Sequence, residues 1–168
     1  MKKRIVSVWV SLLLFALLTA CGGGGGGGEG GTIPVPHAVA MLALTTGGDT
    51  IGSIDLVLDL PEGFHLATDG AGGLLEGVLQ EEIADVFTLT EYLPEDAFNL
   101  GRLHLVLISP EGFTSGAFLS LRRPLAAGEL LPPAEAFVVS SLTVTNLEGV
   151  GLSGYDFILS LSQETTVP

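Results

Sequence analysis

The chain of 168 residues is 47% hydrophobic and only 15% charged, and its 6 basic residues stand against 19 acidic ones, for a net charge of −13. Because no basic stripe is present to neutralise phosphates, this balance excludes nucleic acid as a partner. Cys21 is the only cysteine. The chain therefore forms no internal disulfide, and its stability must come from the burial of apolar side chains.

The first 21 residues have the organisation of an export signal. MKKR supplies a positive start, residues 5–20 carry no charge, and small residues precede Cys21. The apolar run is shorter than the roughly 20 residues that a membrane-spanning helix needs. The sequence Leu18-Thr19-Ala20-Cys21 resembles the lipobox of bacterial lipoproteins. This resemblance implies a signal peptide at residues 1–20, cleavage between Ala20 and Cys21, and acylation of Cys21. An ordinary secretory signal with a chance cysteine is the alternative.

Acylation predicts an envelope location, because several acyl chains anchor a protein stably where one does not. By analogy with the same family, Gly22 after the cysteine fits the outer membrane, facing either the periplasm or the surface. Loss of the signal removes Lys2, Lys3 and Arg4, which leaves three basic and 19 acidic residues and a net charge of −16. Such a charge repels anionic surfaces, so the lipid is expected to bind the membrane.

Residues 22–31 read GGGGGGGEGG, which has no side chains to bury and behaves as a flexible tether. No strand pattern leads into it and no Lys-Ser/Thr follows it, so it is not a nucleotide-binding loop. We assign residues 21–36 to the lipidated cysteine and tether, and residues 37–168 to one folded domain. About 130 residues are a normal size for a domain with one core.

Period-two alternation dominates the domain. Ile54, Leu56, Leu58 and Leu60 share one side of a strand, and the other side carries Asp55 and Asp59. The predicted strands are 37–45, 54–60, 74–79, 86–92, 102–108, 117–121, 137–145 and 155–162. Gly, Pro, Asp or Asn separates nearly all of them, which predicts an all-β sandwich of about eight to nine strands. Only residues 81–86 and 94–100 could form a helical turn.

The segment LVLDLPEGF (56–64) returns as LVLISPEGF (105–113). In each copy, proline suits the second position of a turn, glycine relieves the far side, and phenylalanine can fold back onto the core. The residues that follow differ completely, so no ligating partner is repeated. We predict a shared way of leaving a strand and not a duplicated binding site.

The order of these pieces is similar to cohesin-like domains over about Val39 to Ser162. The segments that carry the resemblance are GDTIGSIDLVLDLPEGFHL, VFTLTEY, GRLHLVLISPEGFTSGAFLSL and AFVVSSLTVTNLEGVGLSG. The resemblance implies a nine-strand jelly-roll sandwich, shared with carbohydrate-binding modules, and a role in non-catalytic binding. Classical cohesins stand in tandem and bind dockerins through one sheet face. This chain has one copy and no dockerin-like calcium loop, so dockerin is not carried over as the partner.

Residues suited to chemistry are few. No two of His37, His65 and His104 stand at a metal-binding spacing from each other, and none has a cysteine nearby, so no zinc site is predicted. No GxSxG elbow occurs, and Gly151-Leu152-Ser153-Gly154 is interpreted as a loop. Asp55 and Asp59 lie about 13 Å apart along their strand, too far for a paired acid and base on one glycosidic bond. We interpret them as keeping an outer face wet.

Two ligand classes stay open at this stage. Asp49 and Glu148 could contribute to loop calcium sites, although neither lies in a DxDxDG pattern. Trp9 leaves with the signal, and the mature chain keeps Tyr92, Tyr155 and seven phenylalanines that mostly alternate like core residues. A flat aromatic platform for polysaccharide is therefore not expected, while sugar binding through loops is not excluded.

These observations predict a protein without catalytic residues, metal or obligate cofactor. The leading hypothesis is a lipid-anchored binding or assembly module at the cell envelope. Its partner would be an envelope or extracellular protein, held on a sheet face or loop rim with acidic and small residues. The alternative is a carbohydrate-binding or adhesion module on the same sandwich. Glycan arrays and envelope pull-downs separate the two.

Overall fold

The fold is described by a computed structural model that covers residues 34–45 and 47–166, all within one compact unit, Ile33–Pro168. The predicted signal, Ala20, Cys21 and the glycine run lie outside the described residues. The described residues form nine strands and one 3-10 turn, Ala134–Ala136, and no α-helix. The predicted all-β sandwich is therefore confirmed. Nothing in the described ranges is a helix of sufficient length and apolarity to cross a bilayer.

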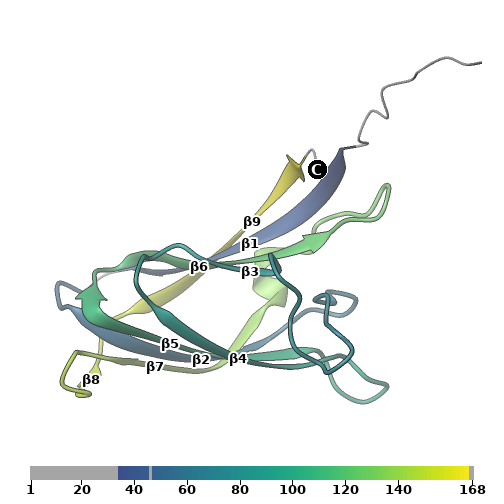
Figure 1. The fold of residues 1–168 in the computed structure, drawn as a ribbon. Coiled ribbons are helices and arrows are strands. Elements are labelled where there is room, and N and C mark those ends of the chain that lie inside the picture. The colour runs from purple at the N-terminus through teal and green to yellow at the C-terminus, as the bar shows by residue number, and fades with distance from the viewer. Residues whose placement is uncertain (1–33, 46, 167–168) are drawn as a thin grey trace, which may run out of the picture. The chain divides into compact units, whose positions relative to one another are not determined.

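Two antiparallel sheets are stacked face to face, as Figure 1 shows. The four-stranded sheet has the order β3-β6-β1-β9, with β3 at Leu79–Glu81, β6 at Gly116–Pro124, β1 at Val35–Thr45 and β9 at Asp156–Thr166. The five-stranded sheet has the order β4-β5-β2-β7-β8, with β4 at Phe87–Leu93, β5 at Arg102–Phe113, β2 at Ile51–Asp59, β7 at Val138–Thr145 and β8 at Gly151–Leu152. Only β4–β5 and β7–β8 follow each other within one sheet, so most connections cross between the layers.

Alternation along the strands builds the core. Ile54, Leu56 and Leu58 of β2 are fully buried, and so are their neighbours Leu103, Leu105 and Leu107 of β5. Successive side chains of a strand point to opposite faces, so every second residue of these strands enters the space between the sheets. The side chains between them face outward, which confirms that Asp55 and Asp59 lie on the outer side of β2.

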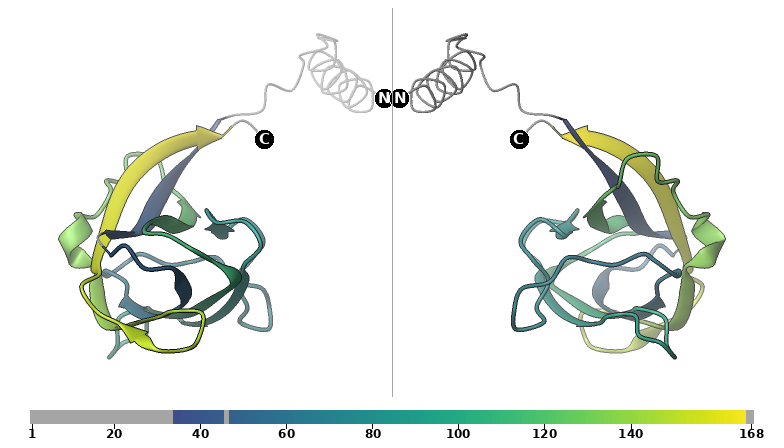
Figure 2. Two further views of the ribbon diagram at one scale, coloured as in Figure 1. Left: turned by 90° about the vertical axis from the view of Figure 1, so that its left-hand side faces the viewer. Right: turned by 90° about the vertical axis from the view of Figure 1, so that its right-hand side faces the viewer.

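The two ends of the domain lie side by side. Val35 at the start of β1 pairs with Thr166 at the end of β9, and the ladder continues to Thr45 opposite Asp156. Figure 2 shows both strands curving together along one layer. The chain thus enters and leaves the described domain through the four-stranded sheet, and the five-stranded sheet contains neither end.

Seven of the eight predicted strands coincide with observed strands, and the strand predicted at residues 74–79 is wrong. Only a single bridge, Thr68 to Leu74, and the short β3 occur there. The carboxylate of Asp69 accepts hydrogen bonds from the backbone N–H groups of Ala71 (2.8 Å) and Gly73 (2.9 Å). This side chain holds the glycine-rich segment in a loop, because it satisfies backbone groups that a strand would otherwise pair.

The two PEGF copies share a backbone feature but not a role. In the first copy, the N–H of Phe64 donates to the carbonyl of Pro61 (3.0 Å), so the predicted turn is confirmed. The second copy stays inside β5 as an irregularity of the ladder, since Ile51 pairs with Phe113 while Ser53 pairs with Ile108. The turn predicted there is wrong.

The glycines explain what the copies have in common. Gly63 has a φ of 75° and Gly112 a φ of 73°, in the left-handed region that glycine tolerates best. At Gly63 this angle closes a turn, and at Gly112 it lets β5 bulge and continue. The repeated sequence supplies the same backbone angle to two different surroundings.

The sequence allowed a helical turn at residues 81–86 or 94–100, but neither segment is helical in the structure. In the latter segment, the carboxylate of Asp96 accepts hydrogen bonds from the N–H groups of Phe98 (2.8 Å) and Asn99 (2.9 Å). These bonds fix a loop between β4 and β5. The only helical turn among the described residues lies at Ala134–Ala136.

Candidate functional site

The surface of the five-stranded sheet that faces away from the core, called the outer face below, presents a regular grid of side chains. Four strands contribute, and the registers place the side chains in four rows. The rows are Phe87-Ile108-Ser53-Thr145, Leu89-Val106-Asp55-Thr143, Glu91-His104-Val57-Ser141 and Leu93-Arg102-Asp59-Val138. The order β4-β5-β2-β7 thus runs from an apolar edge, through charged pairs, to hydroxyl groups.

The apolar edge is exposed to solvent. Phe87 and Leu89 of β4 each retain 66% of their accessible surface, and Leu93 retains 53%. Ile108 on β5, directly opposite Phe87, retains 42%. Large apolar side chains gathered in one place on a surface are typical of interaction sites, whereas single ones are normal anywhere.

Two charged pairs occupy the middle of the outer face. Nε of Arg102 donates to Oδ1 of Asp59 at 2.6 Å, and Nε2 of His104 lies 3.0 Å from Oδ1 of Asp55. The hydroxyl of Ser140 also donates to Asp59. The hydrogen bond from Arg102 holds the pKa of the Asp59 carboxyl below its ordinary value, against the opposing effect of burial.

These pairs arrange the surface more than they stabilise the fold. Exposed ion pairs contribute little to stability, because solvent screens them and ordering their side chains costs entropy. Their effect is to fix the directions of two carboxylates and two cationic or hydrogen-bonding groups on a rigid sheet. A partner therefore meets a preset polar pattern beside the apolar edge.

A shallow pocket of about 500 Å³ lies at one end of the outer face, between β2, β5 and β7. Ser53, Asp55, Val106 and Thr143 are among its lining residues. Within it, the hydroxyls of Ser53 and Thr145 lie 2.7 Å apart. The pocket combines hydroxyl and carboxylate oxygens with aliphatic side chains, a mixture that suits contact with a peptide or a sugar.

A larger pocket of about 750 Å³ lies at the other end, beneath the loop between β4 and β5. It is lined by Asp59 and Arg102 of the outer face and by Leu93, Asn99 and Phe98 of β4 and the loop, among others. Phe98 is 93% exposed. The sequence interpretation that the phenylalanines mostly belong to the core therefore needs correction at Phe87 and Phe98.

The loop that carries Phe98 is held by its own acidic residue. The N–H of Phe98, and after it the side chain and N–H of Asn99, hydrogen-bond to Asp96 and keep the pKa of that carboxyl below its ordinary value. An ionised Asp96 thus stabilises the loop at neutral pH. Phe98 is presented by an ordered turn and not by an unstructured segment.

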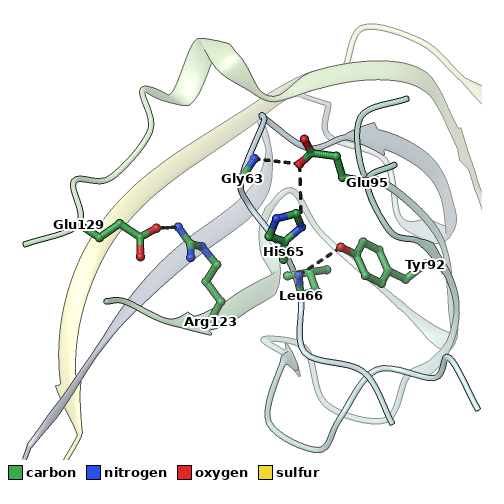
Figure 3. A network of polar contacts seen from close by, with 7 residues as sticks. All are labelled: Gly63, His65, Leu66, Tyr92, Glu95, Arg123 and Glu129. Carbon is green, nitrogen blue, oxygen red and sulfur yellow. Dashed lines mark hydrogen bonds and ion pairs between the residues drawn. The ribbon is translucent and has the colours of Figure 1, made fainter. Parts of the chain in front are cut away.

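The first PEGF turn lies next to this loop, as Figure 3 shows. The N–H of Gly63 donates to Oε2 of Glu95 (2.9 Å), and Nδ1 of His65 lies 3.9 Å from the same oxygen. The N–H of Leu66 donates to the hydroxyl oxygen of Tyr92 (3.2 Å). Tyr92 is only 7% exposed, so it positions the turn and offers no platform for a sugar.

Arg123 closes this end of the sandwich. Its guanidinium lies 4.7 Å from the ring centroid of Phe64. It also forms an ion pair with Glu129, which Figure 3 shows. The hydrogen bond from Arg123, followed by that from the N–H of Ala126, lowers the pKa of Glu129. The side chains here bind other parts of the fold, although Nε of Arg123 is buried without a hydrogen-bond partner among the described residues, so this is a structural cluster.

No family model, curated protein or solved structure matches the chain. The resemblance to cohesin-like domains thus stays a likeness of sequence pattern, and the outer face is the surface that bears on function.

The remaining residues that the sequence singled out are scattered. Nδ1 of His37 lies 3.0 Å from the carbonyl oxygen of Val35, far along the chain from His65 and His104. Asp49 and Glu148 do line one small pocket, together with Asn146. Over residues 34–45 and 47–166, no three His, Cys, Asp or Glu side chains gather as a metal site would require.

The exposed apolar edge is the feature that sequence reasoning missed. The alternation in VFTLTEY placed Phe87 and Leu89 on one side of a strand, but it did not say which side faces the core. Glu91 was the available signal, because it shares their side and opposes burial of that whole face. With this residue weighed, the sequence alone indicates that Phe87 and Leu89 point outward.

Proposed function

We propose that this protein is a non-catalytic, lipid-anchored binding module of the bacterial cell envelope, most suitably at the outer membrane. Cleavage after Ala20 and acylation of Cys21 would provide the anchor. The outer face would hold an envelope or extracellular protein partner. In this role the protein would bind its partner and would not convert it chemically.

The observation that carries the proposal is the exposed column of Phe87, Leu89 and Leu93 beside the ordered pairs Asp59–Arg102 and Asp55–His104. Removal of apolar surface from water supplies free energy of association, and adjacent fixed charges determine how the partner is oriented and which partner is accepted. A rigid sheet carries both, so a partner would order few new side chains on binding. This combination favours a protein–protein contact surface.

Photo-crosslinking tests the proposal directly. Benzoylphenylalanine is placed at Thr143 or Ser141 on the outer face, and at Ser160 on the outward side of the four-stranded sheet as a matched control. All three side chains are exposed. The proposal expects one protein product from both outer-face positions in intact envelopes and none from position 160.

The product must then bind the purified protein, and Asp59→Ala with Arg102→Ala should weaken that binding. Equal crosslinking from both sheets, or a product whose purified form fails to bind, would contradict the proposal. A conversion of the captured molecule by the protein would contradict its non-catalytic part.

Carbohydrate binding on the same sandwich is a second candidate, favoured by Phe98. This 93% exposed ring borders the 750 Å³ pocket together with Asn99, Asp59 and Arg102. An aromatic face beside amide, carboxylate and guanidinium groups matches the apolar face and hydroxyl rim of a sugar. A glycan array with wild type and Phe98→Ala decides the question: binding to a defined glycan that the variant loses supports this candidate.

A further inference from the structure

The four sheet edges differ in how well they are protected against pairing with another chain. β3 is only three residues long, and the two residues of β8 pair with Val144 and Thr145 alone, so the rest of β7 is also open but has serine and threonine beside one exposed valine on its outward side. β9 is long, but Ser160, Ser162 and Glu164 alternate along its exposed side, and the 3-10 turn Ala134–Ala136 lies against it (Figure 2). β4 offers seven residues and none of these protections. Natural sheets usually blunt such an edge with short strands, proline or lysine.

The free edge of β4 carries unpaired backbone groups. All backbone hydrogen bonds that the described residues make with Phe87–Leu93 come from β5, on its other side. The strand contains no proline and no basic residue, and its one charge is Glu91. A strand with an open ladder and exposed apolar side chains is a template for an added strand.

The charge around β4 restricts what that strand could be. Residues 66–101 contain no Lys, Arg or His, but eight acidic residues, namely Asp69, Glu76, Glu81, Glu82, Asp85, Glu91, Glu95 and Asp96. Glu82 and Asp85 lie just before β4, and Glu95 and Asp96 lie just after it. The apolar strip therefore has acidic residues at both ends, and Arg102, which lies opposite Leu93, is already paired with Asp59.

This arrangement disfavours a second copy of the chain as the occupant. In an antiparallel β4–β4 pairing, the acidic segment before β4 in one copy would face the acidic segment after β4 in the other. Like charges placed opposite each other oppose association. A strand with basic residues at its ends has no such conflict.

We propose that a protein partner adds an extended segment to the edge of β4, with alternating apolar side chains over Phe87, Leu89 and Leu93 and basic residues at both ends. This inference rests on the proposed binding function and names how the partner docks. The main-chain bonds would supply affinity, and the apolar and acidic side chains of β4 would select the sequence.

The probe is a synthetic, end-blocked peptide in which valine and threonine alternate between a lysine pair at each end. Calorimetry with the full-length protein in neutral detergent should show binding that weakens as salt rises, because exposed charges are screened beyond a Debye length of about 10 Å at 0.1 M. Leu89→Lys should weaken binding by about tenfold or more. Ile158→Lys is the matched control, because Ile158 is 46% exposed on β9, and it should bind as wild type does.

Two further arms test the geometry and the charge. Alternate N–H groups of an extended peptide point to the same edge, and an added strand pairs with β4 through one edge only. N-methylation of every second residue should therefore abolish binding when it blocks the edge that faces β4, and should be tolerated when it blocks the other edge. Glu82→Lys should weaken binding of the lysine peptide, and replacing the lysine pair at one end of the peptide with glutamates should restore part of that loss. The side chain of Glu82 is exposed, so this variant should fold as wild type does.

Several outcomes overturn the proposal. They are absence of binding by the lysine peptide, binding that survives N-methylation of either edge of the peptide, or a dimer of the full-length protein that Leu89→Lys dissociates. Failure of the peptide with the crosslink from Thr143 intact contradicts edge docking alone. Loss of that crosslink with peptide binding intact contradicts the wider function of the outer face.

Discussion

Three phenylalanine-to-alanine substitutions give the sharpest test of the described fold. Phe64 of the first PEGF copy is 2% exposed, whereas Phe98 of the β4–β5 loop is 93% exposed. Phe113 of the second copy is partly buried against the core. The same change in chemistry is thus made at three levels of burial, so a difference in stability reports burial and packing alone.

The magnitude follows from the surroundings of each ring. Burial and the cavity make Phe→Ala in a core cost about 3–5 kcal/mol. The Phe64 ring packs edge-on against Phe137 at 5.0 Å and lies under Arg123, so about 4 kcal/mol is expected at this position. Phe113→Ala should cost about 1–2 kcal/mol, since less surface is lost. Phe98→Ala should change stability by less than about 0.5 kcal/mol.

Urea denaturation of the chain from residue 22 onward measures these differences. With a slope of about 2 kcal/mol/M, the midpoint of Phe64→Ala should fall by about 2 M and that of Phe98→Ala should not move. Unfolding of Phe64→Ala and Phe98→Ala at the same urea concentration would contradict the described burial, and so would a larger loss of stability in Phe113→Ala than in either of them.

Other predictions concern acid stability, close packing and anchoring. The pKa of Asp59 is lower in the folded state than its unfolded value near 3.8, so its ionised carboxylate stabilises the fold above that pH. This stabilisation is lost as the pH falls through the lower folded pKa. Asp59→Asn should therefore reduce the fall of the melting temperature at acid pH. A Cβ at Gly52 would lie 2.5 Å from the carbonyl oxygen of Asn146, so Gly52→Ala should cost roughly 1–3 kcal/mol in urea, whereas Gly48→Ala, with no atom within 4 Å, should be close to neutral. Cys21→Ser should release the protein from membranes and remove the lipid mass; unchanged membrane association would contradict the proposed anchor.

The strands whose two faces differ strongly could be predicted from the sequence. In β2 and β5, leucine or isoleucine at every second position alternates with Asp, Arg or His, so both the strand and its buried side follow from the pattern. The predicted strand at 74–79 failed because Leu74 makes only the single bridge to Thr68, and Leu75 and Val78 lie outside any strand. The side chain of Asp69 stabilises a loop there, which composition does not reveal.

The candidate site was predicted less fully than the fold. A sheet face with acidic and small residues was expected, and Asp55, Asp59, Ser141 and Thr143 do lie on one face. The position of β4 at an edge depends on long-range pairing, which alternation does not encode. The different fates of the two PEGF copies have the same cause, because the first copy follows the last β2–β5 pair, Asp59 with Arg102, whereas the second copy is still paired with β2 through Phe113 and Ile51.

Cysteine labelling tests most directly whether the outer face is a contact surface. Cys21 is the only native cysteine, and acylation would make it unreactive, so one new thiol can be followed at a time. Leu89→Cys and Ile158→Cys are each treated with a maleimide in intact envelopes and after purification. If the outer face is a contact surface, position 89 is protected in envelopes and reactive once purified, while position 158 reacts equally in both. Equal labelling of position 89 in both states would contradict that role.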